Sequence, residues 1–324
     1  MRSWQVTGKG EPKVVLAKAE KALEAPGPGE LRIKVIASAL ALPDVLLCRG
    51  TYPLTPPGAF TPGLEFVGTV LAAGPHTTLP VGSKVMGVSA FFMGHGAFAD
   101  ECKAYEQSTY LVPEGMNDVD AAAFTIAYQT AHVALVRRAQ LKAGETVLVH
   151  GGAGGTGFAA IQLAKALGAK VVATAGGAAK AAVCRSLGAD VAIDYTAGDF
   201  VPAVKEATGG KGVDIVFDPV GGEVFEKSAE CVAPEGRLLP IGFACGRWGN
   251  IPMVTLTLKN LSIIGAVPSF PRPDMVKVQD ELAQLYRAGK IKMLIDRKIG
   301  FDGIRDGLQD LADRKVNGRV VAVY

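Results

Sequence analysis

The chain is poor in the residue types that build disulfide frameworks and metal clusters. It has only five cysteines and four histidines among 324 residues, and the cysteines are scattered without a Cys-x-x-Cys pair. An odd number of dispersed cysteines does not predict a disulfide framework. The simplest interpretation is a set of reduced thiols in a cytoplasmic protein.

Charge runs and long apolar segments are also absent. The 34 basic and 31 acidic residues leave a net charge of +3 with no Lys or Arg run, so nucleic acid is not indicated as a partner. The opening residues, MRSWQV, lack the apolar core of a signal peptide. The most apolar window, residues 121–136, contains Gln129 and His132 and is too short for a membrane span. We therefore expect a buried helix there, no membrane partner and a cytoplasmic location.

What is present is typical of a soluble globular protein of about two domains. Apolar residues make up 49% of the chain and charged residues 20%. The 40 glycines recur at expected turns and strand ends, so their number does not indicate disorder.

The most informative segment is residues 147–168, which reads as a buried strand, a glycine-rich turn and an amphipathic helix. Gly152, Gly154 and Gly157 satisfy the dinucleotide pattern G-x-G-x-x-G, and a second strand follows at 170–175. Such glycines permit a tight turn, approach of the backbone to a pyrophosphate, and close packing of the helix on the strand. The helix start then offers free N–H groups to phosphate. The predicted contacts in this loop are Gly152, Ala153, Gly154, Gly155, Thr156 and Gly157.

The central third of the chain alternates between strands and helices. Strands are predicted at residues 146–150, 170–175, 191–194, 213–217, 236–241 and 261–267. Helices are predicted at 157–167, 178–187, 200–208 and 222–232. This alternation favours parallel pairing with right-handed crossovers. The predicted fold class is α/β, with a doubly wound parallel sheet of about six strands.

The outer thirds differ from the centre. The first is rich in Pro and Gly, with short alternating strands such as 31–37 and 66–72, which favours an antiparallel barrel or sandwich. The last carries helical patterns at 275–288 and 303–314 and a strand at 318–323. We expect this segment to return to the first third. The predicted domains are 1–119, the inserted nucleotide domain 120–265, and the return segment 266–324.

The end of the second central strand bears on cofactor choice. NAD sites place an acid about 20 residues after the fingerprint, but residues 173–180 contain none, and the first acid beyond is Asp190. A small neutral turn leaves room for a 2′-phosphate, whose charge Lys180 or Arg185 could balance. The sequence therefore predicts NADPH; the alternative for Lys180 is a solvent-exposed helix lysine.

Short motifs recur along the whole chain: residues 37–44 (ASALALPD), 49–53 (RGTYP), 62–70 (PGLEFVGTV), 96–99, 127–131, the glycine loop, 217–222, 259–262 and 317–321. In their order and spacing they resemble the medium-chain dehydrogenase/reductase superfamily, in its zinc-free, zeta-crystallin-like quinone oxidoreductase branch. The resemblance implies a Rossmann domain inserted in a GroES-like β-rich domain. It also implies dimers or tetramers formed through the Rossmann sheets, and hydride transfer from NADPH to a quinone or an activated enone.

The resemblance permits a test for zinc. Metal-dependent relatives carry a Cys, a His and a third ligand at positions that are Ala41, Leu64 and a site near Ile126 in this chain. Their four-cysteine structural lobe corresponds to residues 90–110, where only Cys102 occurs. Since tetrahedral zinc needs three or four N, S or O ligands, no metal is expected. Cofactor placement and hydrogen bonding must then drive the reaction.

Two catalytic residues follow from the resemblance. Tyr52 matches a tyrosine whose phenol can donate to the developing oxyanion, although it could instead cap the loop or pack under the substrate. Thr130 matches a threonine that faces the nicotinamide; the alternative is an ordinary helix residue. Asp44 and Glu65 match acidic positions for which a structural salt bridge is expected.

The remaining cofactor contacts come from the same comparison of motifs. Ala41 stands where relatives often carry an Asn that bonds the cofactor, a bond that water can replace. Phe91, Phe92 and Trp248 are candidates for an apolar cleft or for the core. The predicted contacts outside the glycine loop are Ala41, Thr174, Gly176, Lys180, Tyr195, Val220, Gly242, Phe243 and Val267.

Three functions are compatible with these features. The first is an NADPH-dependent quinone reductase, and the second an NADPH-dependent reductase of enones or enoyl thioesters. A CoA thioester would need basic residues for its phosphates, for which Arg49, Arg247 and Arg272 are candidates. The third is a non-catalytic nucleotide-binding or structural protein.

Overall fold

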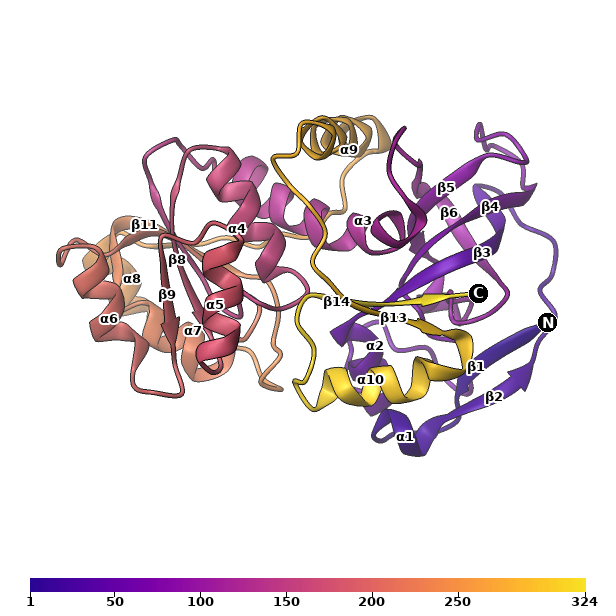
Figure 1. The fold of residues 1–324 in the computed structure, drawn as a ribbon, viewed down its shortest axis with the longest axis horizontal. Helices are drawn as coiled ribbons and strands as arrows, with labels where there is room; N and C mark the ends of the chain where they lie inside the picture. The colour runs from indigo at the N-terminus through magenta and orange to yellow at the C-terminus, as the bar shows by residue number, and fades with distance from the viewer. The chain divides into compact units, whose positions relative to one another are not determined.

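The computed structural model describes all 324 residues, and the chain folds as two compact units (Figure 1). The β unit comprises Met1–Ile126, Pro271–Gln279 and Met293–Tyr324. The α/β unit comprises Ala127–Phe270 and Asp280–Lys292. The boundaries therefore lie at 126 and 270 rather than at the expected 119 and 265, and residues 280–292 return to the α/β unit.

Hydrogen bonds explain the return of that short segment. The hydroxyl of Tyr128 donates to the carbonyl of Lys292 over 2.7 Å. The side-chain amide of Gln162 donates to the same carbonyl, and the N–H of Lys292 donates to Gln162 Oε1. Residue 292 is thus held against the helix that carries Gln162.

The α/β unit contains a six-stranded sheet in the order β12-β11-β10-β7-β8-β9, with every pairing parallel. Its strands are β7 (Thr146–Val149), β8 (Lys170–Ala175), β9 (Val191–Asp194), β10 (Val213–Asp218), β11 (Val232–Pro240) and β12 (Ser262–Ile263). The connecting helices are α4 (Gly157–Ala166), α5 (Ala178–Ser186), α6 (Phe200–Ala207), α7 (Gly222–Ser228) and α8 (Met253–Lys259). The predicted doubly wound α/β fold is confirmed.

The β unit is built on a sheet in the order β13-β14-β3-β4-β5-β6, in which β3 also pairs with β6. Strands β3 to β6 therefore form a closed antiparallel barrel. The sheet strands are β3 (Glu30–Leu40), β4 (Glu65–Ala73), β5 (Lys84–Ser89), β6 (Glu101–Leu111), β13 (Ile295–Gly300) and β14 (Arg319–Val323). A separate hairpin joins β1 (Arg2–Val6) and β2 (Leu16–Glu20).

Helices of the β unit are short, and two longer helices cross the unit boundaries. The short ones are α1 (Pro12–Val15), α2 (Leu42–Arg49) and α10 (Ile304–Ala312). The longer ones are α3 (Asp118–His132), which continues into a π-helical segment at Val133–Arg138, and α9 (Arg272–Arg287). The helix Asp118–Arg138 is long and apolar enough to cross a membrane, but 78% of its most apolar window is buried inside the protein.

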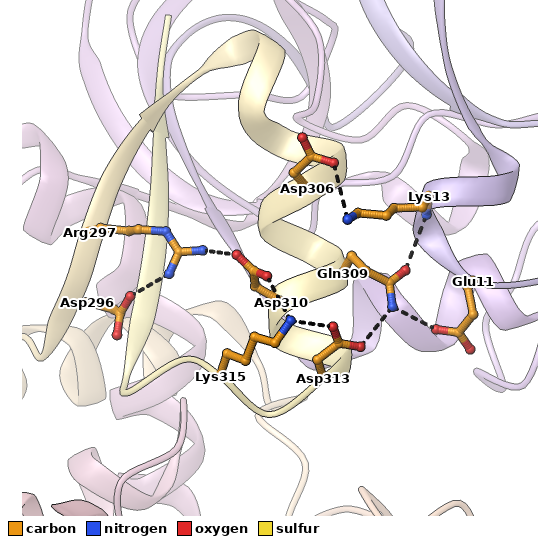
Figure 2. Close-up of polar contacts among 9 residues, drawn as sticks. All are labelled: Glu11, Lys13, Asp296, Arg297, Asp306, Gln309, Asp310, Asp313 and Lys315. Atoms are coloured by element: carbon orange, nitrogen blue, oxygen red, sulfur yellow. Dashed lines mark hydrogen bonds and ion pairs between the residues drawn. The ribbon is translucent and has the colours of Figure 1, made fainter.

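The return segment completes the β unit through main-chain and side-chain contacts. Strand β14 pairs antiparallel with β3, from Val320 opposite Leu40 to Val323 opposite Ala37. Figure 2 shows that Gln309 of α10 accepts from the Lys13 N–H and donates to Glu11, while Arg297 of β13 pairs with Asp310 at 2.6 Å. The two ends of the sequence thus share one folded unit.

Several elements differ from the sequence prediction. The helix expected at 222–232 ends at Ser228, because the Cys231 N–H closes a turn on the Ser228 carbonyl and β11 begins at Val232. The strand expected at 261–267 is reduced to Ser262–Ile263. Helices α2 and α8 and strand β13 were not predicted. The sequence of β13, IDRKIG, lacks the apolar alternation of a half-buried strand, and its pairing with β14 defines it.

Candidate active site

The glycine loop joins β7 to α4 and is tied to both neighbouring strands. The His150 N–H donates to the Phe217 carbonyl at the end of β10, and the Gly152 N–H donates to the Thr174 carbonyl on β8. A bond from the Gly154 N–H to the Gly151 carbonyl closes the turn at 2.8 Å. The loop therefore lies at the carboxyl edge of the sheet, between its two halves, where α/β proteins bind nucleotides.

Two of the three fingerprint glycines are required by close packing. A Cβ at Gly157 would lie 2.2 Å from the Gly151 carbonyl oxygen, and a Cβ at Gly152 would lie 2.7 Å from the sulfur of Cys184. Helix α4 begins at Gly157 without a side-chain cap on its first N–H groups. This uncapped helix start and the positive end of the helix dipole suit an anionic diphosphate.

The turn after β8 has a shape that the sequence could not reveal. The hydroxyl of Tyr195 is 2.6 Å from the point that a Cβ on Gly176 would occupy, so the phenol lies directly over this glycine. Asp194 Oδ1 accepts from the N–H groups of Gly177 and Thr196 and holds the turn. Lys180 stands in the first turn of α5. Arg185, the other candidate for the 2′-phosphate, is in the last turn of α5, and its guanidinium donates to the Ala192 carbonyl.

The side chain of Thr174 faces the protein interior. Its residue is 2% exposed, and its hydroxyl bonds Nδ1 of His150 at 2.9 Å. Nε2 of His150 bonds the Ser228 hydroxyl at 2.8 Å, and burial lowers the pKa of this imidazole to about 3. Neutral His150 thus links β8 to α7 beneath the loop. Sequence reasoning missed this role, because its partners lie 24 and 78 residues away.

Besides the glycine loop after β7 and the turn after β8, two further turns lie at the ends of β10 and β11. The N–H groups of Ala244 and Cys245 donate to the carbonyls of Pro219 and Val220, which brings Gly242 and Phe243 beside the turn that carries Val220. The rings of Phe243 and Trp248 are 4.8 Å apart. Val267 lies beyond β12 at the sheet edge and is exposed.

The candidate catalytic residues belong to different units. Tyr52 follows α2 in the β unit, where its N–H donates to the Leu46 carbonyl and burial, followed by the charge of Asp44, raises the pKa of its phenol. Its ring lies 6.1 Å from that of Phe91. Phe91 is buried in the core of the unit, and the half-exposed ring of Phe92 stacks on Tyr105. Thr130 lies on α3 in the α/β unit and is half-buried.

Two buried acids bond the backbone at, or one residue from, the positions at which relatives bind zinc. The two oxygens of Asp44 accept from the N–H groups of Ala41 and Gly63, each at 2.9 Å. Glu65 Oε1 accepts from the Ile126 N–H at 2.8 Å. No group of three or more His, Cys, Asp or Glu side chains in the chain is arranged to hold a metal ion. The acids therefore organise backbone segments at these positions.

The salt bridge expected for each acid is present for only one of them. Glu65 pairs with Arg319, whereas the expectation for Asp44 is wrong because its oxygens bond backbone amides. Burial is the main cause that raises the pKa of each carboxyl, to about 7 for Asp44, and the charge of Arg319 opposes the rise for both.

Comparison with known proteins places this arrangement in a family. Residues 27–114 match the alcohol dehydrogenase GroES-like domain, and residues 155–284 match the zinc-binding dehydrogenase domain. Quinone oxidoreductase-like protein 2 of Mus musculus is 34% identical over 99% of this chain and 94% of its own length.

Solved structures extend the likeness to the whole fold. The Escherichia coli quinone oxidoreductase complexed with NADPH is 27% identical, with a TM-score of 0.91 and full coverage of both chains. A mycobacterial protein complexed with NADPH is 30% identical, with the same TM-score and coverage. The chain belongs to the quinone oxidoreductase branch of the medium-chain dehydrogenase/reductase superfamily, as its motifs predicted.

Proposed function

We propose that the protein is an NADPH-dependent oxidoreductase that transfers a hydride to a quinone and needs no zinc. The observation that carries the cofactor choice is the turn after β8, whose own residues 173–180 include no acid; Tyr195 lies over Gly176 there, and Lys180 is in the first turn of α5. The relatives solved with NADPH support it.

The chain's own residues fit this cofactor. The tight turn that Gly152 and Gly157 permit and the N-terminal end of α4 suit the diphosphate, while Lys180 and Tyr195 would bind the 2′-phosphate. The remaining contacts would come from Ala41, Thr174, Val220, Gly242, Phe243 and Val267. Bound NADPH would supply the hydride. Thr130 would contact the nicotinamide, and Tyr52 would donate a hydrogen bond to the acceptor oxygen as negative charge develops on it.

The arginines considered for a CoA thioester are already engaged. Arg49 forms two hydrogen bonds with Glu11, and Arg247 pairs with Glu226 at 2.7 Å. Arg272 donates to the carbonyl oxygens of Glu106 and Thr109. These contacts favour a quinone over an enoyl thioester.

Steady-state assays test the proposal directly. NADPH oxidation with quinones, enones and enoyl-CoA esters should be fastest with quinones, and kcat/KM should be at least tenfold lower with NADH. Comparable values for NADH and NADPH would contradict the cofactor choice. Activity restricted to enones would favour the second function, and NADPH binding with no turnover would favour a non-catalytic protein.

Two further measurements test the chemistry. Full activity after extensive chelation, with no zinc found by elemental analysis, is expected for zinc-independent catalysis. Tyr52→Phe should lower kcat/KM by about 10–100-fold if its phenol assists the reaction. An unchanged value would remove Tyr52 from the chemistry.

An exposed apolar surface on the α/β unit favours pairing with a second copy. Strand β12 is the sheet edge, and α8 beside it has no buried residue. The exposed apolar side chains here are Met253, Val254, Leu258, Ile263 and Val267. An unpaired edge with an apolar patch is typical of a two-fold interface, so we propose a homodimer through this surface, with a tetramer as the alternative.

The oligomeric state can be measured by analytical ultracentrifugation. Leu258→Glu, at a side chain 80% exposed in the single chain, should convert the dimer to a folded monomer. A monomeric wild type, or an unaffected dimer in the variant, would contradict this interface. Four of the five free cysteines are buried, which fits the proposed cytoplasmic location; cell fractionation checks it.

A further inference from the structure

Asp218 is a buried carboxylate without a cationic partner. It is the last residue of β10, which lies between β7 and β11, and it is 0% exposed. Its Oδ1 accepts from the N–H groups of Val220 at 2.7 Å and Gly221 at 3.2 Å, and its Oδ2 accepts from Gly221 at 3.1 Å. Its side chain therefore holds the turn that follows the strand.

The backbone of the same residue holds a second turn. Its carbonyl accepts from the N–H groups of Ile241 and Gly242. A Cβ on Gly151 would lie 3.7 Å from side-chain carbons of Pro219 and Val220, so the first turn also lies against the glycine loop. Asp218 is thus the common support of the turns at the ends of β10 and β11.

The position of Asp218 in the sheet indicates which half of the cofactor these turns meet. A doubly wound sheet binds a dinucleotide across the point at which its strand order reverses, with one mononucleotide on each half. The acid-free turn with Tyr195 and Lys180 follows β8 and β9, which assigns the adenosine half to that side. The turns held by Asp218 face the nicotinamide half.

Holding a turn with a buried charge costs desolvation free energy. An ionised carboxyl meets a desolvation cost, but it accepts through both oxygens, whereas an amide or a hydroxyl offers only one acceptor oxygen. Burial raises the pKa of Asp218 to about 6, while the bonds from Val220 and Gly221 lower it. Protonation of Oδ2 would turn an O–H toward the Gly221 N–H and remove one of the two acceptor oxygens, so the turn would be held less firmly.

We propose that Asp218 is a positioning residue whose ionised carboxylate keeps the turn of residues 219–222 in the conformation that receives the nicotinamide half of the cofactor. The proposal rests on the proposed NADPH binding. It predicts that cofactor affinity is linked to the ionisation of this one group.

The neighbouring ionisable groups leave the carboxylate of Asp218 without an ionic partner. Those on the elements packed against it are His150, Glu223, Glu226, Lys227, Glu235, Arg237, Cys245 and Arg247. None bonds its carboxylate: His150 is neutral between Thr174 and Ser228, and Arg247 pairs with Glu226.

Calorimetric binding of NADP⁺ between pH 5 and 8 tests the proposal, because the oxidised cofactor is stable in acid. The 2′-phosphate of NADP⁺ itself titrates near pH 6 and so changes the affinity of both proteins with pH. The wild-type Kd is therefore compared at each pH with the Kd of Asp218→Asn, in which the effect of the phosphate is the same. The Kd of Asp218→Asn should exceed the wild-type Kd by about tenfold at pH 7.5 and approach it at pH 5.

Asp214→Asn is a matched control. Asp214 is on the same strand at its opposite end, where its carboxylate accepts from the Thr146 N–H at 2.7 Å. The ratio of its Kd to the wild-type value should be the same at every pH. A pH-independent ratio for Asp218→Asn would overturn the proposal.

A ligand that lacks nicotinamide provides a test in the wild type alone, should Asp218→Asn not fold. Affinity for NADP⁺ should fall about tenfold more between pH 7.5 and 5 than affinity for 2′-phospho-ADP-ribose. Equal losses would overturn the role of Asp218. A wild type that binds neither ligand would contradict the proposed function itself.

Discussion

The carboxylate of Glu65 on β4 and the guanidinium of Arg319 on β14 form a buried ion pair across 254 residues of sequence. Their side chains are 0% and 3% exposed. The other carboxylate oxygen accepts from the Ile126 N–H in α3. One acid therefore joins the barrel, the return segment and the middle of α3, the helix that leads to the α/β unit.

Breaking this pair should destabilise the protein strongly. Glu65→Gln leaves the Arg319 charge buried without its counterion, at an expected cost of about 3–5 kcal/mol in the free energy of unfolding. The double variant Glu65→Leu with Arg319→Met should recover most of that loss. Urea unfolding measures both. Lys18→Ala, which breaks the exposed Lys18–Asp302 pair, is the control and should change little.

The ionisation of Asp44 should make stability fall as pH rises. Its folded pKa of about 7 lies above the unfolded value of about 4, so the folded state holds the proton more tightly. Its contribution is fully present below pH 4 and is lost by about pH 7. The unfolding free energy of the wild type minus that of Asp44→Asn should therefore fall by about 2–3 kcal/mol between pH 5 and 8.

Parallel pH profiles for wild type and Asp44→Asn would refute that linkage. Asp302→Asn is a control for which the pH dependence of stability should have the opposite sign. The bond from Lys18 lowers the pKa of Asp302, so its contribution is present above the unfolded pKa and is lost as the pH falls.

A methyl group at Gly157 should disrupt the nucleotide loop. The Cβ of Gly157→Ala would lie 2.2 Å from the carbonyl oxygen of Gly151, and because that oxygen belongs to the backbone, the helix start must move. We expect NADPH affinity to fall at least tenfold in fluorescence titrations. Gly198→Ala, where a Cβ meets nothing within 4 Å, should bind as the wild type does. Equal affinities for all three proteins would show that the loop is not the phosphate site.

Lys180 should account for the preference for NADPH. Lys180→Ala should raise the Kd for NADPH about tenfold, because a charge-assisted bond to phosphate is lost, and leave the Kd for NADH unchanged. Arg185→Ala on the same helix is the matched control, since its guanidinium already bonds the Ala192 carbonyl. A larger effect at Arg185 would assign the phosphate to the other residue.

The nucleotide-binding half of the fold was predictable because its determinants are local. Strand β7, the glycine loop and α4 occur where the apolar pattern and the glycines predicted them, each within about one residue. The polar strand β13 was not predictable, since its definition depends on β14, which follows it by 18 residues. The roles of His150 and Asp218 were not predictable either, because they also depend on partners that are distant in the sequence. A buried polar residue within an apolar strand pattern does not indicate which distant groups will bond it.

The sequence alone determined the dinucleotide loop, the acid-free turn after β8 and the apolar residues at the three zinc positions. Each of these depends on residue type within a short segment, where backbone conformation and donor chemistry are decided locally. Only the tertiary structure decided that Asp44 bonds amides while Glu65 bonds Arg319, that Thr174 turns inward to His150, and that Asp218 supports two turns. These contacts depend on long-range strand pairing, which brings together groups whose separation in the sequence carries no periodic pattern.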